Sequence, residues 1–407
     1  MLSTGRLGRG RVALLAVMSC AALLVLILPT AARADAIRNN QQWVLSMMNV
    51  PAAWQLTEGA GVKVAVLDSG VDPYVSDLTG SVITGPDYTG VDTSPANPNW
   101  GVHGTWMASL IAGHGHDGGV DGIIGIAPQA QILSIRVIPD RADPQYDAYE
   151  REPETRIQQS LADGITYAVR HGAKVISMSI GYGAPSAAVR KALQFAYSRG
   201  VVVVASAGNS GGSADTDGAG QSPESFPADY PGVISVGAVG TNGAVANFSS
   251  DNLSVQVAAP GVSVPAQGRD GQYWWVSGTS PACALVAGVA ALIKSLYPSL
   301  APDLVASALT STTTNRPAHG YDSAVGFGIV DAAAALAKAG QLAHHRPGVT
   351  GVAAQTIFGG GPGAIPPDPV GPRGSGPLIL FSLLAVICLA IGGAAGTRLV
   401  SSRRARS

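Results

Sequence analysis

Three short motifs place an acid, an imidazole and a hydroxyl at the ends of regular elements, in that order along the chain. They are Val66-Leu67-Asp68-Ser69-Gly70, His103-Gly104-Thr105 and Gly278-Thr279-Ser280. A serine hydroxyl is a weak nucleophile that needs a neighbouring base. An imidazole can take that proton and return it to a leaving amine, and a carboxylate can hold the ring in one tautomer. These residue types together indicate acyl transfer by a serine nucleophile.

Each of these residues has a simpler interpretation when it is taken alone. An acid that follows a strand is most often a turn or cap residue, and a serine that opens a helix is most simply its N-cap. Asp68-Ser69-Gly70 also matches the aspartic-protease signature, but the chain has no second Asp-Ser/Thr-Gly motif. The catalytic hypothesis therefore depends on all three motifs occurring together and in order.

The elements that must position these residues alternate between strands and helices. Several β-branched runs are apolar at consecutive positions, which favours a parallel sheet covered on both faces. Helical periodicity predicts helices over 157–169 and 185–199, whereas the highly charged segment 139–153 is predicted to be a surface loop. The alternation predicts an α/β fold, a three-layer sandwich around a mostly parallel sheet. The predicted strands are 62–67, 132–138, 174–180, 201–205 and 233–239.

The three motifs resemble those of the subtilisin-like serine proteases, which use the order Asp, His, Ser. Ala205-Ser206-Ala207-Gly208-Asn209 is similar to the strand and Asn that help to form that family's oxyanion hole. Ser179-Ile180-Gly181 is similar to the segment that lines its first specificity pocket. Gly125-Ile126-Ala127-Pro128 and Ala258-Ala259-Pro260-Gly261 fit the family's connecting segments, and the resemblance covers residues 41 to 340.

This resemblance implies a subtilisin-like fold, a protein or peptide substrate, and a reaction that uses no cofactor. The implied catalytic residues are Asp68, His103 and Ser280, with Asn209 and the Ser280 N–H as oxyanion donors. The implied substrate-binding residues are Ser179, Ile180 and Gly181. One departure is Pro281 directly after Ser280, which the first turn of a helix tolerates because its missing N–H would be unpaired there.

The composition argues against a nucleic-acid-binding protein, and the cysteine content argues against a disulfide-stabilised domain. With 25 Lys and Arg against 26 Asp and Glu, the chain has no electrostatic footprint for a nucleic-acid partner. Cys283 is the one cysteine outside the long apolar runs, so no disulfide is expected within the soluble domain. Cys283 is either a small buried hydrophobe or a reactive thiol, and its place on an apolar helix favours the first.

A cluster of His114, His116 and Asp117 raises the question of a metal site. The flanking glycines, and the absence of a helical spacing that would fix ligands, favour an exposed loop instead. No bound metal is therefore predicted.

The two ends of the chain predict a membrane protein. Residues 1–34 have the basic, apolar and small-residue regions of a signal peptide, although an uncleaved anchor is the alternative. The peptidase domain is predicted at 35–340, followed by a Pro/Gly-rich linker at 341–377. Residues 378–397 carry no charge and are long enough for one C-terminal transmembrane helix. The basic tail at 398–407 places the C-terminus in the cytoplasm and the catalytic domain outside the cell membrane.

A secreted subtilisin-like domain with a tether and one C-terminal span resembles the mycosins, the membrane-anchored proteases of actinobacterial type VII secretion systems. That resemblance implies secretion components as substrates or partners. Mycosins often carry disulfides, and this soluble domain has none. Two alternatives remain, which are a secretion scaffold whose proteolysis is dispensable and a general cell-surface protease.

Overall fold

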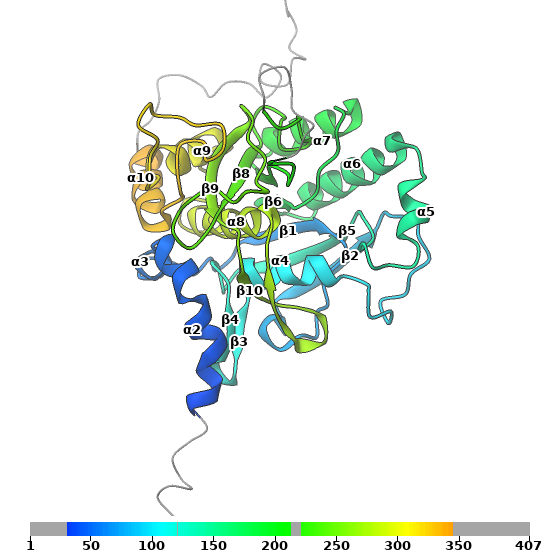
Figure 1. The fold of residues 1–407 in the computed structure, drawn as a ribbon, viewed down its shortest axis with the longest axis horizontal. Helices are drawn as coiled ribbons and strands as arrows, with labels where there is room; N and C mark the ends of the chain where they lie inside the picture. The colour runs from blue at the N-terminus through cyan, green and yellow to red at the C-terminus, as the bar shows by residue number, and fades with distance from the viewer. Residues whose placement is uncertain (1–30, 120, 213–220, 345–407) are drawn as a thin grey trace, which may run out of the picture. The chain divides into compact units, whose positions relative to one another are not determined.

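A computed structural model describes residues 31–119, 121–212 and 221–344, which belong to one compact unit (Figure 1). Helix α2 (Ala31–Met47) begins before the predicted cleavage site after Ala34 and continues through it. Nearly all of the predicted signal peptide lies outside these residues. The same is true of the linker beyond residue 344, the predicted transmembrane helix at 378–397 and the basic tail.

The central element is a seven-stranded sheet in which every neighbouring pair runs parallel. Its five predicted strands are all present, within two residues of the expected ends. In spatial order the strands are β2 (Val82–Asp87), β5 (Gln131–Arg136), β1 (Lys63–Asp68), β6 (Val175–Met178), β7 (Val202–Ser206), β8 (Ile234–Val239) and β9 (Val255–Pro260).

Both faces of this sheet are buried, as the apolar runs in its strands predict. In β1, Val64 and Val66 face one core while Ala65 and Leu67 face the other, because successive side chains of a strand point to opposite faces. Helices α4 (Val102–Ala112) and α8 (Thr279–Leu296) cover the first face. Helices α6 (Glu154–Arg170) and α7 (Ala187–Ser198) lie side by side on the second (Figure 1). The prediction of a three-layer α/β sandwich is confirmed.

Helix α8 is the central helix of the fold. Among the helices of the described residues, it alone is long and apolar enough to cross a membrane. Its apolar window is 83% buried within the protein, and it contacts five strands of the sheet, β1 and β6 to β9. A helix that is apolar on all sides belongs inside a large core, so α8 is a core helix and is separate from the predicted span at 378–397.

Smaller elements surround the three layers. The N-terminal helix α2 is hydrogen-bonded to residues 119–124. Arg38 of α2 donates hydrogen bonds to the carbonyls of Gly119, Asp121 and Gly122, and Gln41 bonds to both the N–H and the carbonyl of Ile124. The smaller elements are α3 (Val50–Trp54), η1 (Ser76–Leu78), β3 (His114–His116), η2 (Asp117–Gly119), β4 (Asp121–Ile124), α5 (Tyr146–Glu150), β10 (Val264–Gln267), η3 (Arg269–Gly271), β11 (Tyr273–Val276), α9 (Pro302–Ser311) and α10 (Ala332–His344).

Three local predictions were wrong. The segment 139–153 contains helix α5, which at five residues is too short to show a helical period. Ala258 to Pro260 end strand β9, although they fit a connecting segment of the family. His114 and His116 lie on β3, paired with β4 in a small antiparallel hairpin, and not in an exposed loop. Glycines at positive φ within that hairpin, such as Gly115, allow its irregular register.

Candidate active site

The predicted site residues follow the carboxyl ends of neighbouring strands. Asp68 ends β1, Ser179 follows β6, and Asn209 follows β7. The chain passes from β1 to β2 and β5 on one side of β1 and returns to β6 on the other side. A reversal of this kind opens a crevice at the carboxyl edge of a parallel sheet, where ligands bind.

Asp68 and His103 are in direct contact. His103 Nδ1 lies 2.8 Å from Asp68 Oδ1 and 3.0 Å from Oδ2, and the Ser69 N–H donates to Oδ1 at 2.7 Å. The Asp68 side chain is 2% exposed and that of His103 is 30% exposed. The carboxylate is therefore fixed beneath the ring, and the ring remains accessible to a reacting group.

Burial alone lowers the pKa of the His103 imidazole, but the charges around it reverse that effect. The Asp68 charge, the Asp68 hydrogen bond and the Asp140 charge all raise the pKa, while Arg141 lowers it. The outcome is a pKa above the usual value for histidine. A base with a raised pKa has a stronger hold on the proton that it takes from a nucleophile.

Ser280 is the second residue of α8, and its neighbours connect it to both remaining predicted groups. The Ser179 hydroxyl donates to the Ser280 carbonyl at 3.2 Å. The Thr279 N–H and hydroxyl donate to Asn209 Oδ1 at 2.9 and 3.0 Å. Because the Asn209 carbonyl is held by these two donors, its NH₂ group is the part that can bind an anion. Ile180 is half-buried and Gly181 is exposed at the carboxyl end of β6.

The turn after Asp68 is braced by a buried cation that sequence reasoning missed. Arg136 is 2% exposed and lies beside Asp68 in the sheet register. Its Nε donates to the Ser69 carbonyl, and its Nη atoms bind Asp87 and Asp143 at 2.6 and 2.9 Å. A charged residue at the end of an apolar strand run was the available signal, since a buried charge must be paired.

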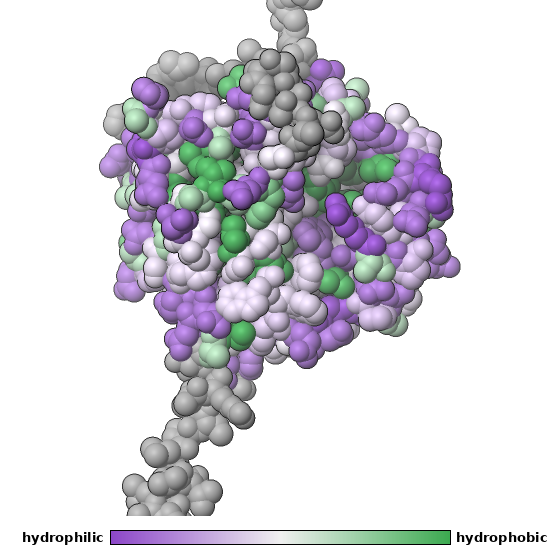
Figure 2. Space-filling model, in the orientation of Figure 1, coloured by the Kyte–Doolittle hydropathy of each residue, from purple (hydrophilic) through white to green (hydrophobic). Residues whose placement is uncertain are grey.

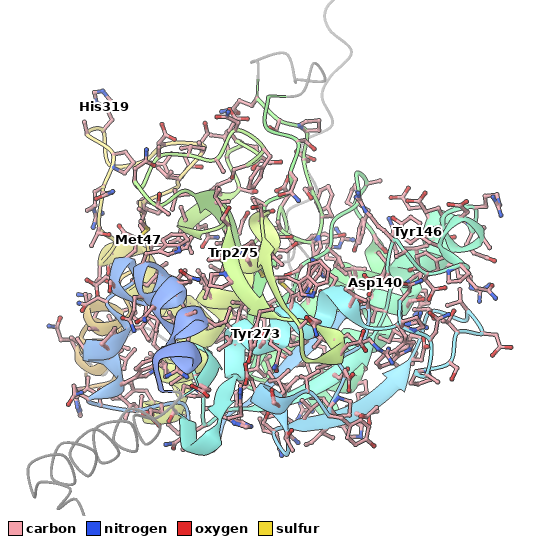
Figure 3. The ribbon with its side chains drawn as sticks, turned by 60° about the horizontal axis from the view of Figure 1, so that its bottom comes forward. Met47, Asp140, Tyr146, Tyr273, Trp275 and His319 are labelled. Atoms are coloured by element: carbon pink, nitrogen blue, oxygen red, sulfur yellow. The ribbon has the colours of Figure 1, made fainter. Side chains whose placement is uncertain are left out.

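Two tryptophans, Trp106 and Trp274, form an aromatic surface next to His103 that the sequence analysis did not predict. The Trp106 ring lies 6.2 Å from the His103 ring, and the Trp274 ring lies 6.1 Å from that of Trp106. Trp274 and Trp275 on β11 are 51% and 56% exposed, and Figure 3 labels Trp275 with its neighbour Tyr273. Trp106 is three residues after His103 on one helix, and this spacing places both on one face.

Cys283 and His116 have structural surroundings that explain them without catalysis. Cys283 is fully buried, as predicted, and burial raises the pKa of its thiol to about 11. A thiol that holds its proton so firmly is not a nucleophile at neutral pH. His116 Nδ1 binds the buried Asp77 carboxylate at 2.6 Å. Among the residues that the structure describes, no three His, Cys, Asp or Glu side chains are grouped to hold a metal ion.

Comparison with known proteins identifies the family of this chain. A sequence profile described as the subtilase family matches residues 59–328. Thermitase from Thermoactinomyces vulgaris is 35% identical over 64% of this chain and 85% of its own. The solved structure of MycP1 from Mycobacterium smegmatis is 30% identical, covers 72% of this chain and 84% of its own, and gives a TM-score of 0.59. For the MycP3 protease of the type VII (ESX-3) secretion system, the identity is 30%, the coverage 72% and 87%, and the TM-score 0.60. These two structures are mycosins.

Proposed function

The chain belongs to the subtilase family of serine peptidases, and from that premise we propose that it is a membrane-anchored endopeptidase with an Asp68–His103–Ser280 triad. The observation that carries this proposal is the double contact between the buried Asp68 carboxylate and His103 Nδ1. The Asp68 carboxylate accepts a hydrogen bond from the Nδ1–H group, so the ring proton stays on Nδ1 and the unprotonated Nε2 can act as the base. Ser280, at the N-terminus of α8, is the proposed nucleophile.

In the proposed reaction, Ser280 Oγ attacks the peptide carbonyl carbon while His103 Nε2 takes the Oγ proton. The oxyanion that forms accepts hydrogen bonds from the Asn209 NH₂ group and the Ser280 N–H. The positive end of the α8 dipole adds to that stabilisation. The intermediate collapses when His103 returns the proton to the leaving amine, and an acyl-enzyme on Ser280 remains. Water, deprotonated by His103, then releases the acid.

The substrate backbone is proposed to lie along Ser179, Ile180 and Gly181. These residues continue beyond the end of β6, and the Ser179 hydroxyl already contacts the Ser280 carbonyl. An extended peptide can pair with such an extended segment through its main chain. At Gly181 a Cβ would lie 2.5 Å from Ser225 Oγ, so a side chain there would force Ser225 to move.

The setting proposed for this activity is the outer face of the cell membrane, in association with a type VII secretion system. The uncharged segment 378–397 and the arginines after it support a single span with a cytoplasmic C-terminus. The likeness to MycP1 and MycP3 supports the link to secretion. The proposed substrates are protein components of that system.

Labelling with a fluorophosphonate tests the proposed chemistry. The probe is expected to modify the wild-type enzyme and to leave Ser280→Ala unmodified, with peptidase activity lost in parallel. Ser311→Ala, which changes an exposed serine on α9, is the matched control and should label like the wild type. Strong labelling or activity in Ser280→Ala would place the nucleophile elsewhere.

Complementation of a deletion strain separates a protease role from a scaffold role. If proteolysis is the contribution to secretion, wild-type protein restores it and Ser280→Ala does not. Full restoration by Ser280→Ala, at equal abundance in the membrane fraction, would favour the scaffold. Recovery of the wild-type protein in the soluble fraction would argue against the membrane anchor.

A further inference from the structure

The helix that carries His103 begins without a cap of its own. Its N-cap residue is Gly101, which offers no side chain and has a φ of 70°. The first N–H groups of a helix need acceptors from outside the helix. In α4 these acceptors come from two other parts of the chain. The His103 N–H donates to the Asp140 carboxylate at 3.2 and 3.4 Å, and the Gly104 N–H donates to Ser69 Oγ at 3.1 Å.

Asp140 itself is held firmly in place. It lies in the loop between β5 and α5 (Figure 3) and is partly buried. Burial raises the pKa of its carboxyl group, and the nearby Ser69 hydroxyl lowers it. Its carbonyl accepts the Asp143 N–H at 2.9 Å, and Asp143 is anchored to the buried Arg136. The loop that bears Asp140 is thus tied to the strand beside the one that bears Asp68.

We propose that Asp140 is a positioning residue for the general base, because it fixes the His103 backbone while Asp68 fixes the His103 ring. This inference rests on the proposed triad. The two carboxylates hold His103 at two points, Nδ1 and the main-chain N–H. Because both the ring and the backbone of His103 are held, Nε2 has little freedom to move. Its position relative to Ser280 sets the rate of proton transfer.

The charge of Asp140 has a second effect, on the proton equilibrium of the ring. The charged groups that act on His103 are Asp68 and Asp140, which raise its pKa, and Arg141, which lowers it, with burial the largest opposing cause. The enzyme is active when His103 is neutral, so kcat/KM falls as the pH drops below this pKa. This fall is the acid limb of the pH profile. Removal of the Asp140 charge lowers the His103 pKa and therefore shifts the acid limb to lower pH.

Two substitutions separate the charge from the hydrogen bond. Asp140→Asn keeps an oxygen that accepts the His103 N–H and removes the charge. It should shift the acid limb to lower pH and leave kcat on the plateau within about threefold of the wild type. Asp140→Ala removes the acceptor as well. The helix start then loses one tether, and kcat on the plateau should fall by about 10- to 100-fold, as expected when a catalytic group is misplaced by up to ~1 Å.

The experiment measures kcat/KM and kcat against pH for wild type, Asp140→Asn and Asp140→Ala with one small peptide substrate. Asp147→Asn is the matched control, since it removes a carboxylate from exposed α5 in the same region and should leave the acid limb in place. Titration of the His103 imidazole by NMR in the Ser280→Ala background reports the same shift without turnover.

Each outcome decides for or against the proposal. The proposal is supported if Asp140→Asn moves the acid limb to lower pH and lowers the His103 pKa measured by NMR. It also requires that the loss of kcat be confined to Asp140→Ala. If the plateau kcat of Asp140→Ala stays within threefold of the wild type, Asp140 does not position the base. If the Asp140→Asn limb coincides with that of the wild type, or if Asp147→Asn shifts it equally, the Asp140 charge does not act on the His103 ring. Should Asp140→Ala fail to fold, the Asp140→Asn profile still decides. Fluorophosphonate labelling of the wild type is independent of these results, so failure of the triad would be seen separately.

Discussion

Replacing Asp68 by Asn should reduce kcat by about 10⁴, which corresponds to ~5.4 kcal/mol of transition-state stabilisation. The side chain keeps its shape, but one oxygen becomes an NH₂ group. Asp68 Oδ1 accepts the Ser69 N–H at 2.7 Å, so the amide oxygen of Asn must remain there. The NH₂ group then occupies the place of Oδ2, which lies 3.0 Å from His103 Nδ1.

That orientation reverses the polarity of the Oδ2 contact, whereas the oxygen at the Oδ1 position, 2.8 Å from Nδ1, stays an acceptor that it shares with the Ser69 N–H. An NH₂ group 3.0 Å from the ring repels the Nδ1 proton and donates to the Nδ1 lone pair, which favours the tautomer with its proton on Nε2. In that tautomer His103 cannot accept the Ser280 proton through Nε2. The expected 10⁴ is therefore a tautomer effect, and stability should change little because a hydrogen bond at this position is retained.

The assay is kcat and kcat/KM for a small peptide substrate, with the rate of fluorophosphonate labelling as an independent measure of Ser280 reactivity. The control is Asp72→Asn, in the same turn, whose carboxylate accepts the Tyr74 N–H and does not contact His103. A fall of less than tenfold in Asp68→Asn, with an unchanged melting temperature, would refute the tautomer argument. An equal fall in Asp72→Asn would point to a general disturbance of the turn.

Three further predictions follow from the same geometry. Asn209→Ala should lower kcat by ~10²–10³, a magnitude taken from a subtilisin, while labelling of Ser280 persists; an unchanged kcat would assign the oxyanion to other donors. Arg136→Leu should cost about 3–5 kcal/mol in urea unfolding, because it leaves the buried Asp143 carboxylate without its cation, and a loss below 1 kcal/mol would contradict that pairing. A chain ended at residue 345 should be secreted, soluble and active on small peptides, and its presence in the membrane fraction would indicate an uncleaved N-terminal anchor.

The sequence predicted most where one short segment contains both the reactive residue and the element that positions it. Asp68 closes an apolar strand, and Ser280 opens an apolar helix, so local pattern alone places each at an element end. Asn209 follows β7 in the same way. Parallel strands then bring these ends to one edge of the sheet without further information. This is why the fold class and the meeting of Asp68 with His103 could be anticipated.

Features that depend on contacts between distant segments left no such pattern. The Arg38 contacts with the β3–β4 hairpin join residues more than eighty positions apart, and neither segment has a period that reveals the other. Hydrophilic and hydrophobic side chains are interspersed over the face shown in Figure 2. The exposed Trp274 could not be placed beside Trp106 from spacing, because β11 and α4 are far apart in the chain.

Asp140 shows that a reactive residue in a local motif depends on contacts from a distant segment. Within segment 139–153 it is one of seven charges, and a charged surface loop was the reasonable interpretation of that composition. Its identity as a helix cap appears only when β5 is seen beside β1, since that register brings the loop after Arg136 to the start of α4. The motif His103-Gly104-Thr105 supplies the base, but its first helical turn has no acceptor of its own, because Gly101 has no side chain to offer. A motif therefore predicts which group reacts, whereas the placement of that group depends on residues that the fold brings to it from elsewhere.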